Sequence, residues 1–382
     1  MKIALVSPYD FSFPGGLTSH ISQLAQQFIA NGNEIKILAP FSPSMVRNLG
    51  LEVIPLGRPI PFPSGGSIAR VSLSLWLLPR IRKILEKEKF DVIHLHEPMA
   101  PLLPLCILHT STTINVGTFH AFHGSNRWYR LSHMLLKKWA KKLDGRIAVS
   151  PPALQHVSKF FPGEYKIIPN GIDVNHFSKD SLQPIQELQD GKVNLLFVSR
   201  LEKRKGLRYL LEAYSKVRWD FPNTRLIVVG PGTPDKLSYR VISERNLQDH
   251  VIFTGPVPYG ELPRYYKTAD IFCAPATGKE SFGIILLEAM AASTPIVATR
   301  IEGFSSVLTH GHEALLVPPK DIDSMADAIS LLIRNPDLRD NLGNNGRKMS
   351  ERYDWKVVAQ EVFTYYQKLI SEKQKALEPK AV

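Results

Sequence analysis

The sequence predicts an α/β protein with two domains, each built around a parallel sheet with helices on its faces. Short apolar runs alternate with stretches of helical spacing, which is typical of buried parallel strands joined by helices. The alternation breaks at a polar, irregular segment over residues 172–191 and then restarts. A chain of 382 residues is also long enough for two domains.

The first half carries six strand-like apolar runs. The opening run stops at Pro8 and is followed by Gly15-Gly16, by apolar residues at helical spacing up to Phe28, and by Gly32 as a stop signal. The six runs lie at residues 2–7, 34–39, 53–54, 92–95, 116–119 and 146–149. We therefore expect a first domain over residues 1–172.

The second half repeats the pattern. Its strand-like runs lie at residues 193–198, 226–229, 251–254, 271–274 and 296–298. A helix is predicted over residues 207–217, and the segment 355–373 is amphipathic. We expect a second domain over residues 173–355 and a final helix over about 356–382.

The cysteine content and the lengths of the apolar runs indicate in which cellular compartment the protein is expected. Cys106 and Cys273 are the two cysteines, and neither lies in a CxxC pair, so the sequence offers no disulfide framework and no thiolate metal site. The opening apolar run is too short for a signal peptide, and no run reaches the ~18 apolar residues that cross a bilayer. We expect a protein of the reducing cytoplasm.

Positive charge is concentrated in the first half. The net charge is +12, and residues 1–180 hold 20 basic and 11 acidic residues. Such an excess predicts an acidic partner: a phosphate-bearing ligand, an anionic membrane or a nucleic acid. Two stretches contribute most, residues 80–89 and 137–142. In the second, lysines lie opposite Leu135, Trp139 and Leu143, a pattern that fits a helix on anionic lipid and equally a helix packed on the sheet.

Ligands of parallel α/β domains bind at the carboxyl ends of the strands, so we expect the binding residues in the turns that follow strands. Pro14-Gly15-Gly16 precedes a helix, where glycine lets backbone approach a ligand and the helix start favours an anion. Arg200 and Lys205 follow a strand and precede another helix, which suits adjacent phosphates. Because Lys203 and Arg204 make this stretch densely basic, it can also be interpreted as a run of solvated charges without a ligand.

The most specific turn contains Glu280 and ends in a helix that carries Glu288. Glu280 is placed to accept hydrogen bonds from ligand hydroxyls, and Glu288, about two helical turns on, to hold a vicinal diol such as a ribose. Between them Ser281, Phe282, Gly283 and Ile284 form the helix start, with amides directed at an anion. Gly230 ends another strand in a weaker glycine turn. GxGxxG and Walker A patterns do not occur, which disfavours a nicotinamide oxidoreductase.

Histidines form a further group. His120 ends a strand, where it suits a hydrogen bond to a sugar hydroxyl or a structural role. His94 and His96 share one face of a strand, but no third ligand is evident, so no metal is expected.

Taken together, these residues resemble the family 4 retaining glycosyltransferases of the two-Rossmann-domain (GT-B) type. Within that family the chain is most similar to bacterial phosphatidylinositol mannosyltransferases. The resemblance extends over nearly the whole chain. It rests on Pro14-Gly15-Gly16, His94-Leu95-His96-Glu97-Pro98, Thr118-Phe119-His120, residues 168–173, Arg200 with Lys205-Gly206, Glu280-Ser281-Phe282-Gly283 with Glu288-Ala289-Met290-Ala291, and Tyr353-Asp354-Trp355.

The resemblance implies roles for these residues. Arg200 and Lys205 would neutralise the donor diphosphate, Glu280 would bind donor-sugar hydroxyls, and Glu288 the ribose. Gly16 would let its loop approach the diphosphate, and His120 would contact the sugar near its 6-hydroxyl. The final helix would cross back to the first domain, and no metal or other cofactor is implied.

The implied partners are a nucleotide-diphosphate sugar, GDP-mannose first and UDP-hexoses next, a lipid acceptor and an anionic membrane surface. Tyr9 and Arg70 are possible acceptor contacts. Leu17-Thr18, Met99 and Ala121 stand where the inositol-lipid enzymes carry polar residues, which leaves another lipid or polyol open as acceptor. A non-catalytic membrane- or nucleic-acid-binding protein is the rival interpretation of the charge, and a nucleotide-sugar epimerase is a rival within this architecture.

Overall fold

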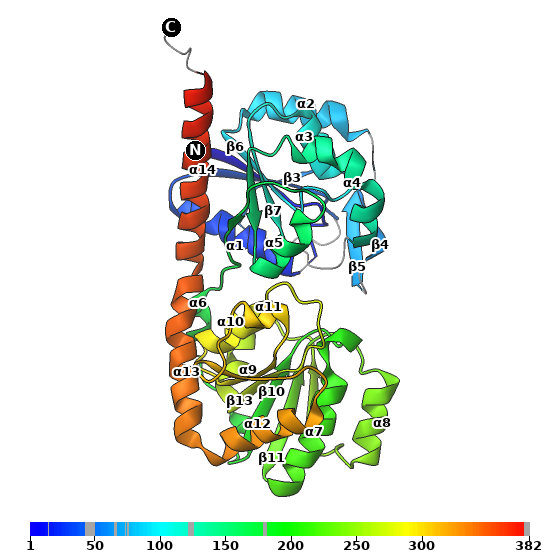
Figure 1. Ribbon diagram of the computed structural model, residues 1–382, viewed down its shortest axis with the longest axis vertical. Helices are drawn as coiled ribbons and strands as arrows, with labels where there is room; N and C mark the ends of the chain where they lie inside the picture. The colour runs from blue at the N-terminus through cyan, green and yellow to red at the C-terminus, as the bar shows by residue number, and fades with distance from the viewer. Residues whose placement is uncertain are drawn as a thin grey trace. The chain divides into compact units, whose positions relative to one another are not determined.

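In a computed structural model the chain forms two compact units (Figure 1). The first comprises Met1–Asn170 together with the chain from Trp355 onward, and the second comprises Gly171–Asp354. The structure describes residues 1–13, 15–42, 50–64, 67–72, 74, 76–120, 126–178 and 182–377. Pro14, Ala121 and the end of the expected final helix beyond residue 377 lie outside these ranges.

A seven-stranded sheet organises the first unit. Its strands are β1 (Lys2–Val6), β2 (Glu34–Ala39), β3 (Val53–Pro55), β6 (Val92–His96), β7 (Ile114–Phe119), β8 (Gly145–Ala148) and β9 (Lys166–Ile167). They are arranged in the order β3-β2-β1-β6-β7-β8-β9, and every neighbouring pair is parallel. An antiparallel hairpin of β4 (Pro59–Ser64) and β5 (Ser67–Ser72) follows β3 and has no counterpart among the expected strands.

Helices cover both faces of this sheet. They are α1 (Gly16–Ala30), α2 (Leu77–Glu88), α3 (Leu103–Thr110), α4 (Asn126–Ala140), α5 (Pro151–Ser158) and α14 (Trp355–Leu377). Ile3 and Leu5 of β1 pack in one core with α1 and α14, whereas Ala4 and Val6 pack in another core with α2, α3 and α4. Successive strand residues point to opposite faces, so one short apolar strand contributes to two cores. The return of α14 to this unit agrees with the expected fold.

The second unit contains a six-stranded sheet. Its strands are β10 (Val193–Val198), β11 (Thr224–Val229), β12 (Val251–Gly255), β13 (Ile271–Ala274), β14 (Ile296–Thr299) and β15 (Ala314–Val317). Their order is β12-β11-β10-β13-β14-β15, again with parallel neighbours. The first strand therefore lies in the middle and the order reverses beside it, which is the Rossmann arrangement. The predicted fold class is confirmed for both units.

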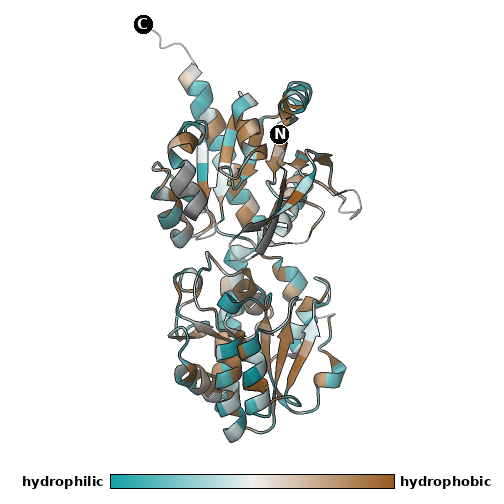
Figure 2. Cartoon of the chain, turned by 90° about the vertical axis from the view of Figure 1, so that its right-hand side faces the viewer, coloured by the Kyte–Doolittle hydropathy of each residue, from teal (hydrophilic) through white to brown (hydrophobic). Residues whose placement is uncertain are grey.

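The helices of the second unit also form two layers. They are α6 (Val174–Ser178), α7 (Leu207–Asp220), α8 (Lys236–Glu244), α9 (Leu262–Thr268), α10 (Ile284–Ala291), α11 (Glu302–Ser305), α12 (Ile322–Arg334) and α13 (Pro336–Ser350). One core holds α6, α9, α10 and α11, and the other holds α7, α8 and α12. Figure 2 shows the strands of this sheet largely in the hydrophobic colour, with helices of mixed colour outside them.

Two expectations were wrong in detail. Residues 172–191 were expected to be irregular, but Val174–Ser178 forms α6, because Val174 and Phe177 bury their side chains in the core. Leu135 was placed on the packed face of the second basic helix, but it is 72% exposed. Leu136 and Ala140, four residues apart, are buried instead, so the packed face is rotated from the expected one.

Over the described residues, no helix combines the length and apolarity that a membrane span needs.

Candidate active site

The residues predicted for donor binding lie at the carboxyl ends of the second unit's strands. Arg200 follows β10 and Glu280 follows β13, the two neighbouring strands between which the strand order reverses. Loops that leave such neighbours diverge to opposite faces of the sheet and leave a crevice there. The fold itself thus brings these two turns, 80 residues apart in sequence, to one place.

Glu280 is the centre of a partly buried ion-pair network. Its Oε1 lies 2.6 Å from Nζ of Lys205 and also contacts the guanidinium of Arg204. Glu202 pairs with Nε of Arg204 at 2.9 Å and with Nη1 of Arg200 at 2.8 Å. Three cations thus face two carboxylates, and an entering diphosphate would compete with those carboxylates for the same cations.

Burial distinguishes the members of this network. The side chains of Lys205 and Glu280 are only 14% and 13% exposed, whereas that of Arg200 is 50% exposed. Burial lowers the pKa of Lys205, and the Glu280 carboxylate opposes that shift. Lys205 therefore depends on a negative neighbour to keep its charge. Arg200 reaches the network only through Glu202.

Arg204 and Glu202 are functional candidates that sequence reasoning missed. Arg204 was left as part of a solvated charge run, yet its side chain is only 26% exposed. The 3-10 turn over Lys203–Lys205 directs Arg204 and Lys205 to the same carboxylate. A signal was present in the sequence, because Glu202 sits between two arginines, but its partners become visible only in the folded turn.

The start of α10 is free of a side-chain cap in the described part of the chain. Gly283 occupies the N-cap position with φ 111°, and Ile284 begins the helix. Phe282 is buried against Tyr353, with ring centroids 5.9 Å apart, which fixes the loop that carries Ser281. The amide of Leu286 already donates to the Gly283 carbonyl at 3.0 Å, so the amides of Ile284 and Ile285 are the ones that the helix start offers to an anionic ligand.

Glu288 lies in a different environment from Glu280. It is buried, and the hydroxyl of Tyr266 donates to its Oε2 at 2.7 Å. Burial raises the pKa of Glu288 to about 7, although the Tyr266 hydrogen bond acts in the opposite sense. Burial thus favours the neutral acid, and in either protonation state the carboxyl group can accept a hydrogen bond.

Two of the three predicted donor-binding glycines, Gly16 and Gly230, differ in the reason that favours glycine at their positions. A Cβ on Gly230, at φ 139°, would lie 1.9 Å from the carbonyl oxygen of Ser199, so the protein's own packing demands glycine. A Cβ on Gly16, the first residue of α1, would meet nothing within 4 Å. Packing inside the protein thus gives no reason for glycine at position 16, and close approach of a ligand would give one.

In the first unit the predicted acceptor residues are neighbours. Tyr9 pairs with Val71 in a short antiparallel bridge, and the amide of Asp10 donates to the Arg70 carbonyl at 2.8 Å. The Arg70 guanidinium lies over the ring of Phe13, 3.7 Å from its centroid. Burial raises the pKa of Tyr9, so its hydroxyl stays protonated.

Two of the departures from the inositol-lipid pattern have structural roles. Met99 is completely buried in the core beneath α2 and α3. The hydroxyl of Thr18 donates within its own turn, 2.9 Å from the Gly15 carbonyl. Neither side chain therefore argues against a polyol acceptor.

His120 belongs to a buried histidine cluster. His20 of α1, His96 of β6 and His120 each offer a nitrogen, and these nitrogens lie within 4.8 Å of one another. Such a group could hold a metal ion. Sequence reasoning did not bring His20 and His120 together with His96, because the three residues come from separate elements. However, Nδ1 of His96 already lies 3.1 Å from Nε2 of His120, and His20 meets both rings edge to face. An ion would have to displace that hydrogen bond.

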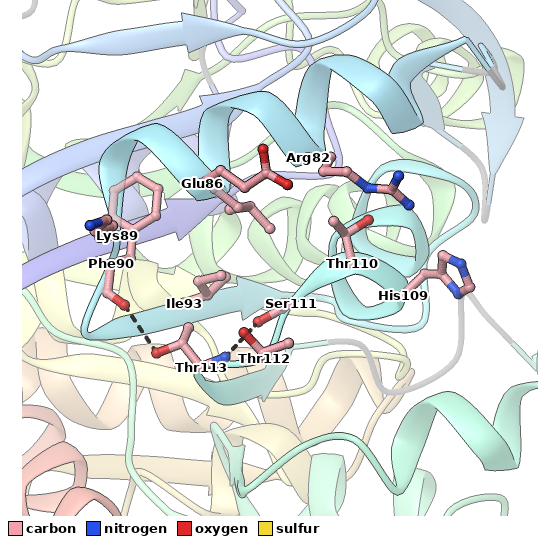
Figure 3. A pocket seen from close by; sticks show the side chains of 11 residues that line it. Arg82, Glu86, Lys89, Phe90, Ile93, His109, Thr110, Ser111, Thr112 and Thr113 are labelled. Atoms are coloured by element: carbon pink, nitrogen blue, oxygen red, sulfur yellow. Dashed lines mark hydrogen bonds between the residues drawn. The ribbon is translucent and has the colours of Figure 1, made fainter.

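A separate cavity of about 620 Å³ lies at the opposite, amino-terminal edge of β6 and β7 (Figure 3). Arg82, Leu85 and Glu86 of α2 line it, with Lys89, Phe90, Ile93 and residues 109–113. It contains none of the predicted donor or acceptor residues. Two cations of the first basic stretch, Arg82 and Lys89, border it.

The fold and the charged turns define a glycosyltransferase of the two-Rossmann-domain class. The family model described as Glycosyl transferases group 1 matches residues 178–349, and that described as Glycosyltransferase Family 4 matches residues 14–176. A phosphatidyl-myo-inositol mannosyltransferase of Mycobacterium leprae is 38% identical over 96% of both chains. One of Mycobacterium tuberculosis is 36% identical over 96% of this chain and 97% of that protein.

A solved structure, Anabaena HepE in complex with UDP, matches with a TM-score of 0.80 at 19% identity, over 96% of this chain and 100% of that one. This likeness supports the fold. The two family models and the full-length relatives settle the family. The chain belongs to the family 4 glycosyltransferases.

Proposed function

We propose that the protein transfers a hexose, with mannose from GDP-mannose as the first candidate, to a lipid acceptor, with phosphatidylinositol as the first lipid to test. The observation that carries the proposal is the full-length similarity to enzymes named phosphatidyl-myo-inositol mannosyltransferase. The ion-pair network around Glu280 supports it, because cations and carboxylates together suit a diphosphate bound to a polyhydroxy sugar.

The residues have distinct roles in this proposal. Arg200 and Lys205 neutralise the diphosphate, while Glu280 accepts hydrogen bonds from the sugar and Glu288 from the ribose. The amides at the start of α10 add donors to the leaving group. His120 contacts the sugar near its 6-hydroxyl.

Catalysis is electrostatic in this proposal. The nucleotide diphosphate leaves, the acceptor hydroxyl attacks the same face of the sugar, and the configuration is retained. Removing one preorganised hydrogen-bond donor that stabilises the charge developing in the transition state typically lowers the rate by ~10²–10³-fold. Side-chain cations and helix amides stabilise the leaving group, so no metal is required in the proposal.

A screen of donors against acceptors tests the function. The protein is incubated with GDP-mannose, UDP-glucose or UDP-galactose and with vesicles of phosphatidylinositol, phosphatidylglycerol or diacylglycerol. We expect a lipid product heavier than its acceptor by one hexose residue, formed equally well in EDTA, with the donor's anomeric configuration by NMR. Hydrolysis or epimerisation of the donor without a glycosylated acceptor would count against transfer.

We also propose that the first unit binds the cytoplasmic face of an anionic membrane. Met134 and Leu135 of α4 are 77% and 72% exposed, beside exposed Lys137 and Lys138, and Trp76 before α2 is 90% exposed. Exposed apolar side chains among cations suit an anionic lipid interface.

Flotation with vesicles tests this surface. Wild-type protein should float with phosphatidylglycerol vesicles, less so at high salt, and a Met134→Ser, Leu135→Ser double variant should float less. Trp219→Ser is the matched control, because Trp219 is 88% exposed but belongs to the second unit. Equal flotation of the double variant and wild type would exclude α4 as the contact.

A further inference from the structure

A chain of polar side chains crosses the otherwise apolar core between the first sheet and α14. His94 and His96 on β6 point to this face, because they alternate with Ile93 and Leu95, which pack in the opposite core. Tyr366 reaches the same layer from α14 and is completely buried. Burying a polar group in such a layer costs free energy unless the group is hydrogen-bonded, so the partners of these side chains matter.

The chain of contacts begins on α14 and ends at His120. The Tyr366 hydroxyl lies 2.5 Å from Nδ1 of His94, whose Nε2 lies 2.6 Å from Oγ1 of Thr118. The rings of His94 and His96 stack with centroids 4.4 Å apart. Nδ1 of His96 then lies 3.1 Å from Nε2 of His120.

These contacts restrict the ring of His120. Burial holds the pKa of His96 and of His120 well below the ordinary value, so both rings are neutral. Two neutral imidazoles at hydrogen-bond distance share one proton between the facing nitrogens. The main-chain amide of His120 donates to Oε1 of Glu97 at 2.7 Å, which fixes the backbone beneath the ring. The His96 contact therefore restricts the orientation and the tautomer of His120, together with a hydrogen bond between the side chains of His120 and Asn170.

We propose that His96, supported by His94 and Tyr366, is a positioning residue that holds the imidazole of His120 in one orientation and one tautomer. The inference rests on the proposed contact of His120 with the donor sugar. Nε2 of His96 has no hydrogen-bond partner among the described residues, so the only polar contact of this buried ring is the one to His120.

Replacement of His96 tests the proposal by kinetics. His96→Leu removes the contact, and His96→Asn retains an amide group near the position of Nδ1. We expect kcat to fall about 10–100-fold in His96→Leu while the donor KM stays within about 3-fold, because a misplaced group costs up to ~10² in rate. His96→Asn should recover most of the loss. A folded His96→Leu protein with wild-type kcat would overturn the proposal.

Nitrogen NMR of the imidazoles gives a readout that needs no turnover. In protein labelled with ¹⁵N-histidine, His120 is assigned by loss of its signals in His120→Gln. We expect one neutral tautomer for His120 in the wild type and altered nitrogen shifts in His96→Leu. Identical His120 shifts in the two proteins would contradict the proposed contact.

Tyr366→Phe tests the distant end of the chain. It removes one hydroxyl from a side chain that is remote in sequence from every proposed donor residue, and we expect a kcat about 3–10-fold lower with unchanged KM. Tyr214→Phe is the matched control, because Tyr214 is also completely buried and donates to the Thr224 carbonyl at 3.0 Å. Equal kcat values for Tyr366→Phe and Tyr214→Phe would show that Tyr366 does not support the positioning of His120, and would leave that role to His96.

The kinetic results also separate this inference from the proposed function. If His120→Gln keeps wild-type turnover, the proposed role of His120 fails, and the NMR shifts still report whether His96 holds the ring. If His120→Gln loses turnover and His96→Leu does not, the positioning role alone is wrong.

Discussion

Substitution of Lys205 by glutamine separates catalysis from stability. The lysine lies 2.6 Å from Glu280 and is only 14% exposed, but Glu280 keeps Arg204 as a second partner. The variant therefore leaves no carboxylate unpaired, and the cost should be that of one largely buried ion pair whose carboxylate keeps a second partner, about 1–2 kcal/mol. In a unit of this size, Gly171–Asp354, each kcal/mol corresponds to a Tm shift of about 2–4 °C.

The loss in turnover should be much larger. If the ammonium of Lys205 stabilises charge on the departing diphosphate, kcat/KM should fall ~10²–10³-fold, equivalent to about 2.7–4 kcal/mol of transition-state stabilisation. The assay compares wild type, Lys205→Gln and the control Lys216→Gln, with Tm measured on each. Lys216 is an exposed lysine of the same unit, paired with Asp323. Turnover of Lys205→Gln within a factor of two of wild type would refute the reasoning.

Three further predictions concern single side chains. Gly16→Ala should fold with an unchanged Tm, because among the described residues the added methyl meets no atom within 4 Å beyond its chain neighbours and its own helix backbone. The substitution should nevertheless weaken binding of GDP by at least about tenfold in calorimetry. Glu88 pairs with Lys2 and Lys36, which lower its pKa from 4.5 to about 2, so stability present above pH 4.5 should be lost as pH falls towards 2, and Glu88→Gln should flatten that decline in Tm. Burial raises the pKa of Glu288 from 4.5 to about 7, so the folded state binds this proton more tightly than the unfolded state does. The resulting stability should be fully present below pH 4.5 and lost as the pH rises through 7. A Glu288→Gln protein whose Tm declines as steeply between about pH 5 and 8 as that of wild type would contradict this.

The succession of strands and helices along the chain, and the turns at the ends of those strands, were readable from the sequence. Short apolar runs fix the central strands of both sheets, since a strand covered on both faces must be apolar throughout, as Val193–Val198 is over most of its length. The edge elements were less visible. The hairpin of β4 and β5 is interrupted by prolines at positions 59, 61 and 63, so its sequence shows no strand-like apolar run. The short α6 depends on Val174 and Phe177 meeting a core built from distant segments.

The residues of the candidate site likewise divide into those that the sequence predicted and those that only the folded structure revealed. Glu280, Lys205 and His120 were predicted because each lies in a turn that follows an apolar strand, and in the second unit parallel topology directs the turns of Lys205 and Glu280 to one edge of the sheet. Arg204 and Glu202 were missed, because their ion pairs require the turn after β10 to meet the loop after β13.

By itself, the sequence determined the alternation of strands and helices, the two-domain organisation and the chemical types present at the strand ends. Those features depend on local periodicity and on which residues can be buried. Tertiary structure decided which charges neutralise one another and that His20, His96 and His120 converge. Contacts between distant segments depend on three-dimensional packing, which leaves no periodic signal along the chain.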